Sequence, residues 1–324
     1  MPGKSPQTIP RIDIAPFMAG SGKAPATVAA VRKACEEIGF FAIAGHGVPD
    51  PAIARIYDLS RAFFDLPAPQ KARVAKTGTL LGGLMHFPLK AESLGSTRGD
   101  PKPGDWKESL DYGPGFYGDA WPAAPAGLQQ AWLNYYEVMG GLARVLRRIL
   151  ASAMGLPEDH FESQFDRHLS SLRINHYPDQ PTAPEPGQLR AGAHTDYGFL
   201  TILRSEDAPG GLQVMTRAGD WIDVPTQPGT LLVNLADTLM RMTNDRWVST
   251  PHRVVNPPRT LTQGTRRQSI AYFHNPNASA MVGCLPQFCD EAHPAKYESI
   301  RYGDYAALKY YQAHGETLTQ DAKA

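Results

Sequence analysis

The spacing of apolar residues differs between the first and second halves of the chain. In the first half, apolar positions recur every three or four residues, which is the spacing of one buried helix face. This pattern predicts helices at residues 28–39, 53–64 and 128–154. The third is the longest, and its continuous apolar stripe indicates a helix that supports the core. Two short apolar segments, 9–14 and 40–45, are typical of strands.

Beyond residue 168, apolar and polar residues alternate in short segments that are separated by Gly, Pro and Asp. Period-two alternation between turn signals is typical of strands. The strands predicted in this way lie at residues 170–177, 199–203, 211–215, 221–224, 231–235, 253–256 and 268–273. Several short strands at close spacing favour a sandwich or barrel. The pattern therefore predicts a mainly β fold with flanking helices.

The remaining segments complete the predicted organisation. Residues 75–125 are rich in Gly, Pro and Asp, so we expect long loops with little regular structure there. Residues 1–8 are expected to be a disordered lead-in, and 295–313 to be helical. We divide the chain into an N-terminal helix and strand region, 1–125, and a long helix with a barrel, 126–324, packed as one globular unit.

Charge and cysteine content exclude several classes of function. Lys plus Arg and Asp plus Glu number 32 each, so the net charge is zero and gives no attraction for nucleic acid or an anionic membrane. No segment approaches the roughly 20 apolar residues of a membrane helix, and no signal-peptide pattern is present. Three cysteines cannot all pair, which favours free thiols in a reducing compartment. We expect a cytoplasmic monomer that acts on a small molecule.

The candidate chemistry begins at His194 and Asp196, in the sequence HTD. Side chains two positions apart on a strand point to the same face, so this pair can converge on one point. His252 lies at the start of another predicted strand and can supply a third ligand. Two imidazoles and one carboxylate form the facial triad of non-haem iron(II) oxygenases, which leaves positions open on the ion. No thiolate is present to favour a closed zinc site.

A His-x-Asp pair is weak evidence on its own, because short motifs need structural context. Histidines are more often surface or hydrogen-bonded core residues than ligands. We expect that ordinary role for the remaining histidines outside the candidate sites, which are His46, His160, His168, His176, His274, His293 and His314. The segment at 105–108 (DWKE) is likewise expected to be part of the scaffold and not a catalytic pair.

The wider context comes from ten segments that occur in a fixed order. They are IPRIDI, ACEEIGFFAIAGHGVP, GDWKESLDYG, LRINHYP, HTDYGFLTIL, GGLQV, GDWIDVP, NLADTLMRMTND, STPHRVVNP and RRQSIAYFHNPN. In order and spacing this set resembles the isopenicillin N synthase-like family of 2-oxoglutarate and iron(II)-dependent oxygenases, over residues 9–280. The resemblance implies a double-stranded β-helix (jelly-roll) core, and it implies that His194, Asp196 and His252 hold Fe(II).

The same resemblance implies a site for 2-oxoglutarate. The Arg-x-Ser motif of the family corresponds to Arg267 and Ser269, which bind the distal carboxylate in members that use this cosubstrate. The planar donor fork of Arg and the Ser hydroxyl suit a carboxylate, and two-residue spacing aims both to one face. Arg266 is expected to face away. The resemblance also makes Asn175 and Tyr177 cosubstrate contacts.

The implied activity is hydroxylation or another oxidation of a small organic molecule, with consumption of O2 and 2-oxoglutarate and release of succinate and CO2. One alternative is an oxidase of the same family that does not use 2-oxoglutarate. Another is a non-catalytic, metal-dependent binding protein on the same barrel. A zinc hydrolase is a third, but it needs a general base beside the metal, and the motifs offer none.

Substrate contacts are less clearly marked. Period two places Arg173 on the same strand face as Asn175 and Tyr177, where it can pair with an anionic substrate group or with a buried carboxylate. The family resemblance points to further positions near the substrate, for which core packing is an equal alternative. They are Met85, His86, Phe87, Phe199 and Phe273.

Overall fold

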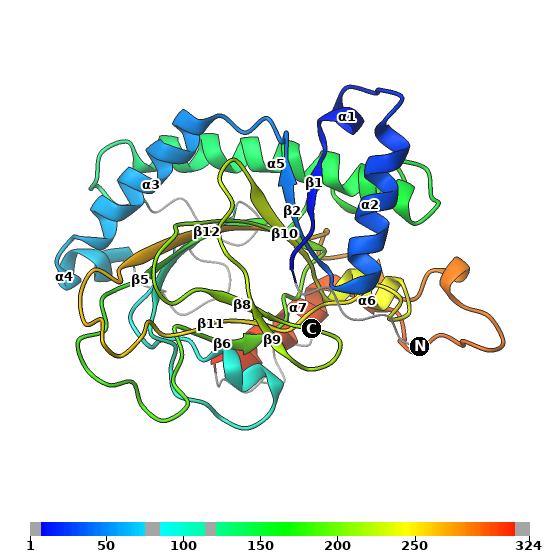
Figure 1. Cartoon of the computed structure of the whole chain (residues 1–324). Helices are drawn as coiled ribbons and strands as arrows, with labels where there is room; N and C mark the ends of the chain where they lie inside the picture. Colours follow the sequence, from blue (N-terminus) through cyan, green and yellow to red (C-terminus); the bar gives the residue numbers. More distant parts are fainter. Residues whose placement is uncertain (1–7, 75–84, 114–120, 315–324) are drawn as a thin grey trace.

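Two β-sheets face each other and helices cover the outer side of the larger one, as the computed structural model of the chain shows (Figure 1). The structure describes residues 8–74, 85–113 and 121–314. Within them, one sheet has eight strands and the facing sheet has four. In Figure 1 the longest helix, α5 (Leu128–Ala153), lies at the top above the large sheet, and the small sheet lies below the large one. The arrangement confirms the predicted mainly β fold with flanking helices.

The eight-stranded sheet contains strands from both predicted regions of the chain. Its order is β1 (Arg11–Asp13), β2 (Phe40–Ala44), β10 (Leu231–Leu235), β7 (Leu200–Ser205), β12 (Arg267–His274), β5 (Ser171–Tyr177), β4 (Glu108–Tyr112) and β3 (Met85–Phe87). β1 and β2 pair in parallel, and the other neighbours pair antiparallel. The first region therefore supplies both edges of the sheet, while the division at residue 125 stays a prediction.

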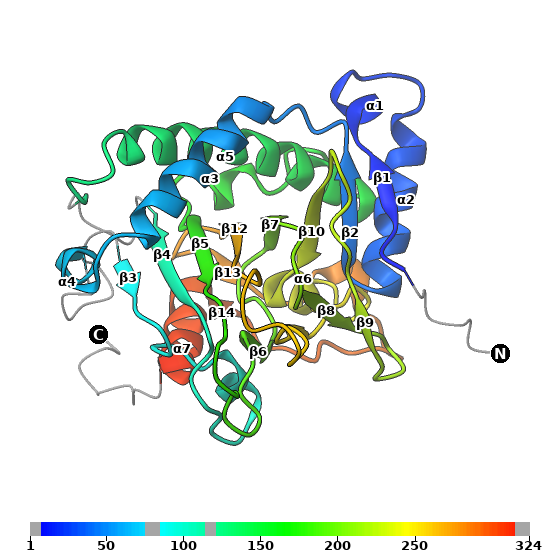
Figure 2. The ribbon, with the colours of Figure 1, turned by 60° about the vertical axis from the view of Figure 1, so that its left-hand side comes forward.

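The four-stranded sheet carries the start of the metal motif. Its order is β6 (Ala191–His194), β11 (His252–Val254), β8 (Leu212–Met215) and β9 (Trp221–Asp223), all antiparallel. Figure 2 shows β6, β8 and β9 on the side away from α3 (Asp50–Phe64) and α5 (Leu128–Ala153). A further pair, β13 (Met281–Val282) and β14 (Ile300–Arg301), forms a separate two-stranded sheet. The space between the two large sheets is where the candidate ligands meet.

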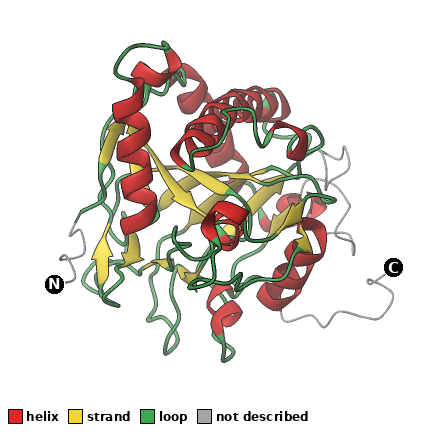
Figure 3. Ribbon diagram, turned by 90° about the vertical axis from the view of Figure 1, so that its right-hand side faces the viewer, coloured by secondary structure: helices red, strands yellow, loops and turns green. Residues whose placement is uncertain are grey.

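Three helices pack on the outer face of the large sheet, and their apolar faces form the core with it (Figures 1 and 3). They are α2 (Ala24–Glu37), α3 (Asp50–Phe64) and α5 (Leu128–Ala153). α5 buries Trp132, Met139 and Leu146, as its stripe predicts. These helices close the large sheet to solvent on one side, so its other face is left for the cavity.

The remaining helices are short or terminal. They are α1 (Ala15–Met18), α4 (Ala68–Lys71), α6 (Asp237–Met242) and α7 (Tyr302–His314), with 3-10 turns η1 (Ala72–Val74), η2 (Leu94–Arg98), η3 (Glu162–Gln164) and η4 (Pro286–Phe288). α7 lies on the opposite side of the sheets from α5 and contacts η2 (Figure 1). None of the helices described is both long enough and apolar enough to cross a bilayer.

The predicted helices and strands are confirmed, but two segments differ. The composition of residues 75–125 predicts loops, whereas the structure places β3, η2 and β4 in the part that it describes. β4 is polar in composition yet buried at every position, because its charged side chains pair inside the protein. The C-terminal helix begins at Tyr302 and not near 295, since Ile300 and Arg301 pair with β13. The expected lead-in at 1–8 lies almost wholly outside the described residues.

Candidate active site

The three predicted metal ligands come together between β6 and β11. His194 ends β6 and His252 begins β11, and the two are direct partners across this antiparallel pair. Asp196 follows β6 and points to the same place, with its Oδ1 atom 3.8 Å from His194 Nε2 and 3.7 Å from His252 Nε2. The candidate ligand atoms all lie within 4.8 Å of one another. That separation allows one ion to bind all three.

Hydrogen bonds fix the orientation of both imidazoles. His194 Nδ1 lies 2.7 Å from Gly192 O, and His252 Nδ1 lies 3.1 Å from Thr250 O. A carbonyl oxygen only accepts, so each Nδ1 carries the proton and donates it. Each Nε2 therefore keeps its lone pair and directs it to the shared centre, as in metal sites where the second ring nitrogen is held by a carbonyl.

Asp196 is oriented in the same way by its second oxygen. Oδ2 accepts hydrogen bonds from Thr201 Oγ1 at 2.5 Å and from Asn234 Nδ2 at 2.7 Å, which leaves Oδ1 for a metal. Burial alone would raise the pKa of Asp196, but His252, His194 and these two hydrogen bonds lower it overall. Burial, together with His252, lowers the pKa of His194 to about 3. A deprotonated carboxylate and a neutral imidazole are the forms that bind a divalent ion, so the donor set fits iron(II).

A cavity of about 500 Å³ opens beside these ligands. Two adjacent strands form much of its wall, and every second residue of each faces it. These residues are Ser171, Arg173, Asn175 and Tyr177 on β5, and Arg267, Ser269, Ala271 and Phe273 on β12. The polar face of β5 therefore lines the cavity and not the outer surface. The two-residue spacing of Arg267 and Ser269 places both on the cavity side, as predicted.

The Arg267 end of the cavity contains a buried cation that its neighbours satisfy only in part. Arg267 is 3% exposed. Its Nη2 bonds to the Ser205 hydroxyl and its Nε donates to Glu206 O at 3.2 Å, while Nη1 has no hydrogen-bond partner among the described residues. Tyr177 OH lies 3.5 Å from Ser269 Oγ beside it. A buried N–H without an acceptor is unfavourable, so this site suits a carboxylate ligand.

Arg266 and Asn175 occupy the positions expected of them. Arg266 faces away from the cavity, where its Nη1 pairs with Asp65 at 2.7 Å and its Nε bonds to His176 at 2.8 Å. Asn175 lines the cavity, and its Oδ1 is buried without a hydrogen-bond partner in the described structure. It lies directly opposite Ser269 across the β5–β12 pair, which puts its amide next to the Arg-x-Ser side chains.

Arg173 is paired with buried carboxylates. Its Nε and Nη2 donate to Asp111 Oδ2 at 3.0 and 2.7 Å, and its Nη1 donates to Glu92 Oε1 at 2.9 Å. The sequence left open whether Arg173 pairs with a substrate group or with a carboxylate of the protein. In the structure it pairs with carboxylates of the protein. Arg173 also lines the cavity, as does the predicted aromatic contact Phe273.

Three other predicted substrate contacts lie elsewhere. Phe199 is fully buried in the core against Phe161 and Phe165, with ring centroids 5.1 and 5.2 Å apart. His86 bonds to Glu108 at 3.0 Å, and the Phe87 ring lies under the Arg173 guanidinium at 5.2 Å. Phe199, His86 and Phe87 are absent from the described cavity lining, so the structure does not support them as substrate contacts. The side chain of Met85 lies outside the described residues.

Several site residues were not predicted as such. Thr201 and Asn234 hold Asp196, and Lys107 and Asp111 line the cavity. The sequence around these residues was compatible with more than one role. Asn234 lies within the NLAD segment, and Asp111 belongs to a stretch whose polar composition indicated a loop. α7 also contributes to the lining, through Tyr302, Gly303, Ala306, Ala307 and Tyr310.

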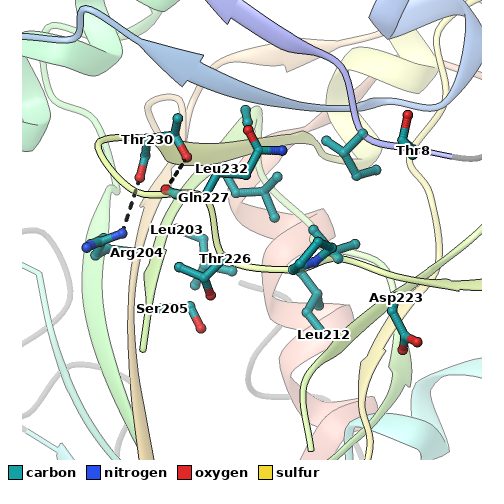
Figure 4. A pocket seen from close by; sticks show the side chains of 14 residues that line it. Thr8, Leu203, Arg204, Ser205, Leu212, Asp223, Thr226, Gln227, Thr230 and Leu232 are labelled. Atoms are coloured by element: carbon teal, nitrogen blue, oxygen red, sulfur yellow. Dashed lines mark hydrogen bonds between the residues drawn. The ribbon is translucent and has the colours of Figure 1, made fainter. Parts of the chain in front are cut away.

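A smaller cavity, about 130 Å³ in volume, adjoins the large one (Figure 4). Leu203 and Leu212 line both cavities and separate them. Arg204 in its wall donates to Thr230 O at 3.4 Å, and the Thr230 hydroxyl donates to Gln227 O at 2.8 Å. None of the predicted metal or cosubstrate residues is among the described residues that line it. The candidate chemistry therefore belongs to the larger cavity.

Comparison with known proteins gives consistent matches over nearly the whole chain. Residues 169–276 match the 2OG-Fe(II) oxygenase superfamily, and residues 9–131 match the family described as non-haem dioxygenase in morphine synthesis N-terminal. The 2-oxoglutarate-Fe(II) type oxidoreductase hxnY of Emericella nidulans is 33% identical, covering 99% of this chain and 96% of that protein. Homoarginine-6-hydroxylase 2-ODD-233 of Oryza sativa is 32% identical, covering 95% and 98%.

Solved structures agree with these matches. A full-length protein of Neurospora crassa, in complex with alpha-KG and thymine, aligns with a TM-score of 0.82 and 32% identity, covering 94% of this chain and 96% of that one. The dioxygenase for auxin oxidation of rice aligns with a TM-score of 0.74 and 28% identity, covering 97% and 99%. Both regions of the chain are covered in each case.

Proposed function

The chain belongs to the isopenicillin N synthase-like family of 2-oxoglutarate and iron(II)-dependent oxygenases, and from that premise we propose which residues perform each part of its reaction. It is an enzyme with the double-stranded β-helix fold that oxidises a small molecule. Iron, with 2-oxoglutarate and O2, supplies the oxidising chemistry, and the products include succinate and CO2. The named relatives are 2-oxoglutarate enzymes, which disfavours an oxidase that does not use it and a binding protein without activity.

The metal is held by His194, Asp196 and His252. The observation that carries this proposal is the convergence of their ligand atoms, within 4.8 Å, at the wall of the large cavity. Gly192 O and Thr250 O orient the two imidazoles. With three ligands from the protein, an iron(II) ion held here would keep coordination positions for other ligands.

The cosubstrate end is formed by Arg267, Ser269, Asn175 and Tyr177. The Nη1 of Arg267 and the Ser269 hydroxyl bind the distal carboxylate of 2-oxoglutarate, while Tyr177 lies beside Ser269. A carboxylate there neutralises a buried cation and accepts from the donor that the described residues leave unsatisfied. Burial of this end keeps the cosubstrate in one orientation and excludes water from it.

The substrate occupies the opposite end of the cavity, near Arg173 and Phe273. One related structure contains thymine, and other relatives are named for homoarginine, validamycin A and auxin oxidation. We propose a small organic substrate, without nucleic acid or membrane partners, because the chain has no net charge. A cytoplasmic monomer remains our prediction, supported for the compartment by the three free cysteines.

The proposal is tested by adding Fe(II) and 2-oxoglutarate to the protein without oxygen. Chelation of the metal by the keto acid is expected to produce a visible charge-transfer band, and H194A or D196A to abolish it. Admission of oxygen with candidate substrates is then expected to release succinate in proportion to substrate. A protein that binds Fe(II) yet gives no band, or that oxidises a substrate without succinate, would refute the 2-oxoglutarate assignment.

A further inference from the structure

Four charged side chains form a network at the end of the cavity away from Arg267. Lys107 Nζ pairs with Glu92 Oε2 at 2.5 Å, and Arg173 joins Glu92 Oε1 to Asp111 Oδ2 at 2.9 and 2.7 Å. The side chains of Lys107, Glu92 and Asp111 are at most 4% exposed, and that of Arg173 is 14% exposed. Lys107, Asp111 and Arg173 line the cavity. A network this deeply buried is costly to build unless its charges and hydrogen bonds are satisfied.

The strand register places this network next to the cosubstrate site. Asn175 lies opposite Ser269, and Arg173, two residues earlier on β5, lies opposite Ala271. Asp111 is the direct partner of Arg173 on β4. Two residues along a strand span about 7 Å, so Asp111 and Arg173 lie about that far beyond the proposed 2-oxoglutarate contacts. A substrate must bind on this side, since the cosubstrate occupies the Arg267 end.

One carboxylate oxygen in the network has no donor among the described residues. Asp111 Oδ2 accepts both hydrogen bonds from Arg173, whereas Oδ1 is buried and without a partner there. A buried acceptor without a donor is unfavourable, and a ligand N–H can satisfy it. Lys107 is its counterpart, because its ammonium has three hydrogens and Glu92 is its one acceptor in the described part of the chain.

The charges of the network are already paired with one another. Within these ion pairs, the cations Lys107 and Arg173 meet the carboxylates Glu92 and Asp111. A charged group of a ligand would therefore compete with existing ion pairs and lose its hydration, whereas a neutral group loses less. A neutral group with both an N–H and a C=O matches an unpaired acceptor and a partly used donor that belong to residues lining one cavity. Amides and imides have this arrangement, and the Phe273 ring in the same wall suits their planar shape.

We propose that Asp111, oriented by Arg173, recognises the N–H of a neutral amide or imide in the substrate, while Lys107 donates to its carbonyl oxygen. This inference rests on the proposed function, because it places the substrate in the same cavity as 2-oxoglutarate. Asp111 is thus a specificity-determining residue, and the triad and the Arg267 site are the same for any substrate.

The test uses matched pairs of compounds on the protein loaded with Fe(II) and 2-oxoglutarate without oxygen. Thymine is compared with 1,3-dimethylthymine, and 2-pyrrolidinone with its N-methyl form, since methylation replaces each N–H donor by a methyl group and keeps the ring and its carbonyl oxygens. Homoarginine and indole-3-acetate serve as a cation and an anion. Binding is measured by calorimetry and by the change in the charge-transfer band. At least one N–H compound is expected to bind about tenfold more tightly than its methylated form and than either charged compound.

Equal binding within both pairs, tighter binding of a charged compound, or no binding of any N–H compound at millimolar concentration would overturn the inference. A missing charge-transfer band in the wild type would instead reject the proposed function. The two failures are therefore distinguishable.

The variant D111N keeps the size of the side chain and an oxygen for Arg173, but presents an NH2 group in place of Oδ1. We expect it to retain the band and to lose or reverse the preference for N–H over N-methyl, which a purely structural role would leave unchanged. D290N, at an exposed aspartate outside the cavity lining, is the matched control and should keep the preference. An unchanged preference in D111N contradicts the proposal, and the matched pairs remain a test even if this variant does not fold.

Discussion

Asp196 shows how residues that do not touch the metal prepare its site. Thr201 and Asn234 occupy one of its carboxylate oxygens, which fixes the direction of the other. Loss of a partner of this kind typically lowers the affinity of a site for its metal by about 10–100-fold. They act by removing orientations of the ligand that cannot bind the ion.

We therefore predict that T201V weakens Fe(II) binding by about 10–100-fold without unfolding the protein. The hydroxyl is replaced by a methyl group of similar size, so Asp196 loses a donor while the packing is retained. Anaerobic Fe(II) titration measures the effect. T230V is the control, because the Thr230 hydroxyl bonds to Gln227 O in the smaller cavity. Equal Fe(II) affinity in the two variants would contradict the proposed role of Thr201.

Arg267 gives a second prediction at this scale. R267K keeps the charge but loses the planar donor fork, so the KM for 2-oxoglutarate should rise by about 10–100-fold. The measurement is succinate formation as a function of 2-oxoglutarate concentration. R266K alters the neighbouring arginine, which faces Asp65 and His176, and should leave this KM within about twofold. A similar KM in both variants would exclude Arg267 as the carboxylate contact.

The sequence predicts single site residues well where a short local spacing carries the information. His194 with Asp196, and Arg267 with Ser269, are pairs two apart in the chain, so their shared face follows from an extended backbone. Asn234, one partner of Asp196, cannot be found in this way, because it comes from a strand that is distant in the sequence. The sequence could not decide between core packing and a substrate contact for Phe199, because an apolar residue has the same signal in the core and in a cavity wall, and the structure places it in the core.

Among the elements, α7 closes the cavity from the side opposite α5. Tyr302 and Ala306 line the cavity, and Tyr305 OH donates to Asp237 Oδ2 at 2.6 Å. Lys309 Nζ lies 3.6 Å from the same oxygen. Asp237 Oδ1 in turn accepts from Ser249 at 2.7 Å, near the strand that begins with His252. α7 is therefore attached to the metal-binding part of the barrel through one buried aspartate.

We predict that Y305F combined with K309M increases hydrogen exchange over residues 302–314, because both polar links to Asp237 are lost. Mass spectrometry of the exchanged protein measures it, with α5 as the internal reference that should not change. Y297F removes a hydroxyl that donates to Asp245 at 2.6 Å and should leave α7 protected. Unchanged exchange in the double variant would show that α7 is held by packing alone.

Elements were predictable when one face was apolar and the other polar. α5 and β5 have that pattern and were identified close to their observed bounds. β4 was missed because its charged residues are buried, with Glu108 bound by Lys71, His86 and His176. Sequence periodicity reports exposure to water, and it fails where polar groups satisfy one another inside the protein.

At the scale of the whole molecule, Asp105 links the contact between η2 and β6 to folding stability. It is 2% exposed and accepts backbone N–H groups of Gly192 at 2.8 Å and Leu94 at 3.2 Å, so it ties η2 to β6. Burial raises the pKa of Asp105 from 3.8 to about 6. The folded state thus holds the Asp105 proton more tightly than the unfolded state does.

The stabilisation from this proton is present below about pH 4 and is lost as the pH rises through about 6. The shift corresponds to about 3 kcal/mol of unfolding free energy. We predict that the stability of the wild type relative to D105N falls by about 2 kcal/mol between about pH 4.5 and pH 7. Urea unfolding of metal-free protein measures this difference. A difference that is independent of pH would show that Asp105 is ionised throughout the range.

The whole account depends on one ion shared by two imidazoles and a carboxylate. The most direct measurement is diffraction from crystals grown without oxygen in Fe(II) and 2-oxoglutarate, with data on both sides of the iron absorption edge. We predict one anomalous peak within bonding distance of His194 Nε2, Asp196 Oδ1 and His252 Nε2. Electron density for 2-oxoglutarate should extend from this peak to Arg267. Iron bound elsewhere, or bound by fewer than these three side chains, would contradict the account.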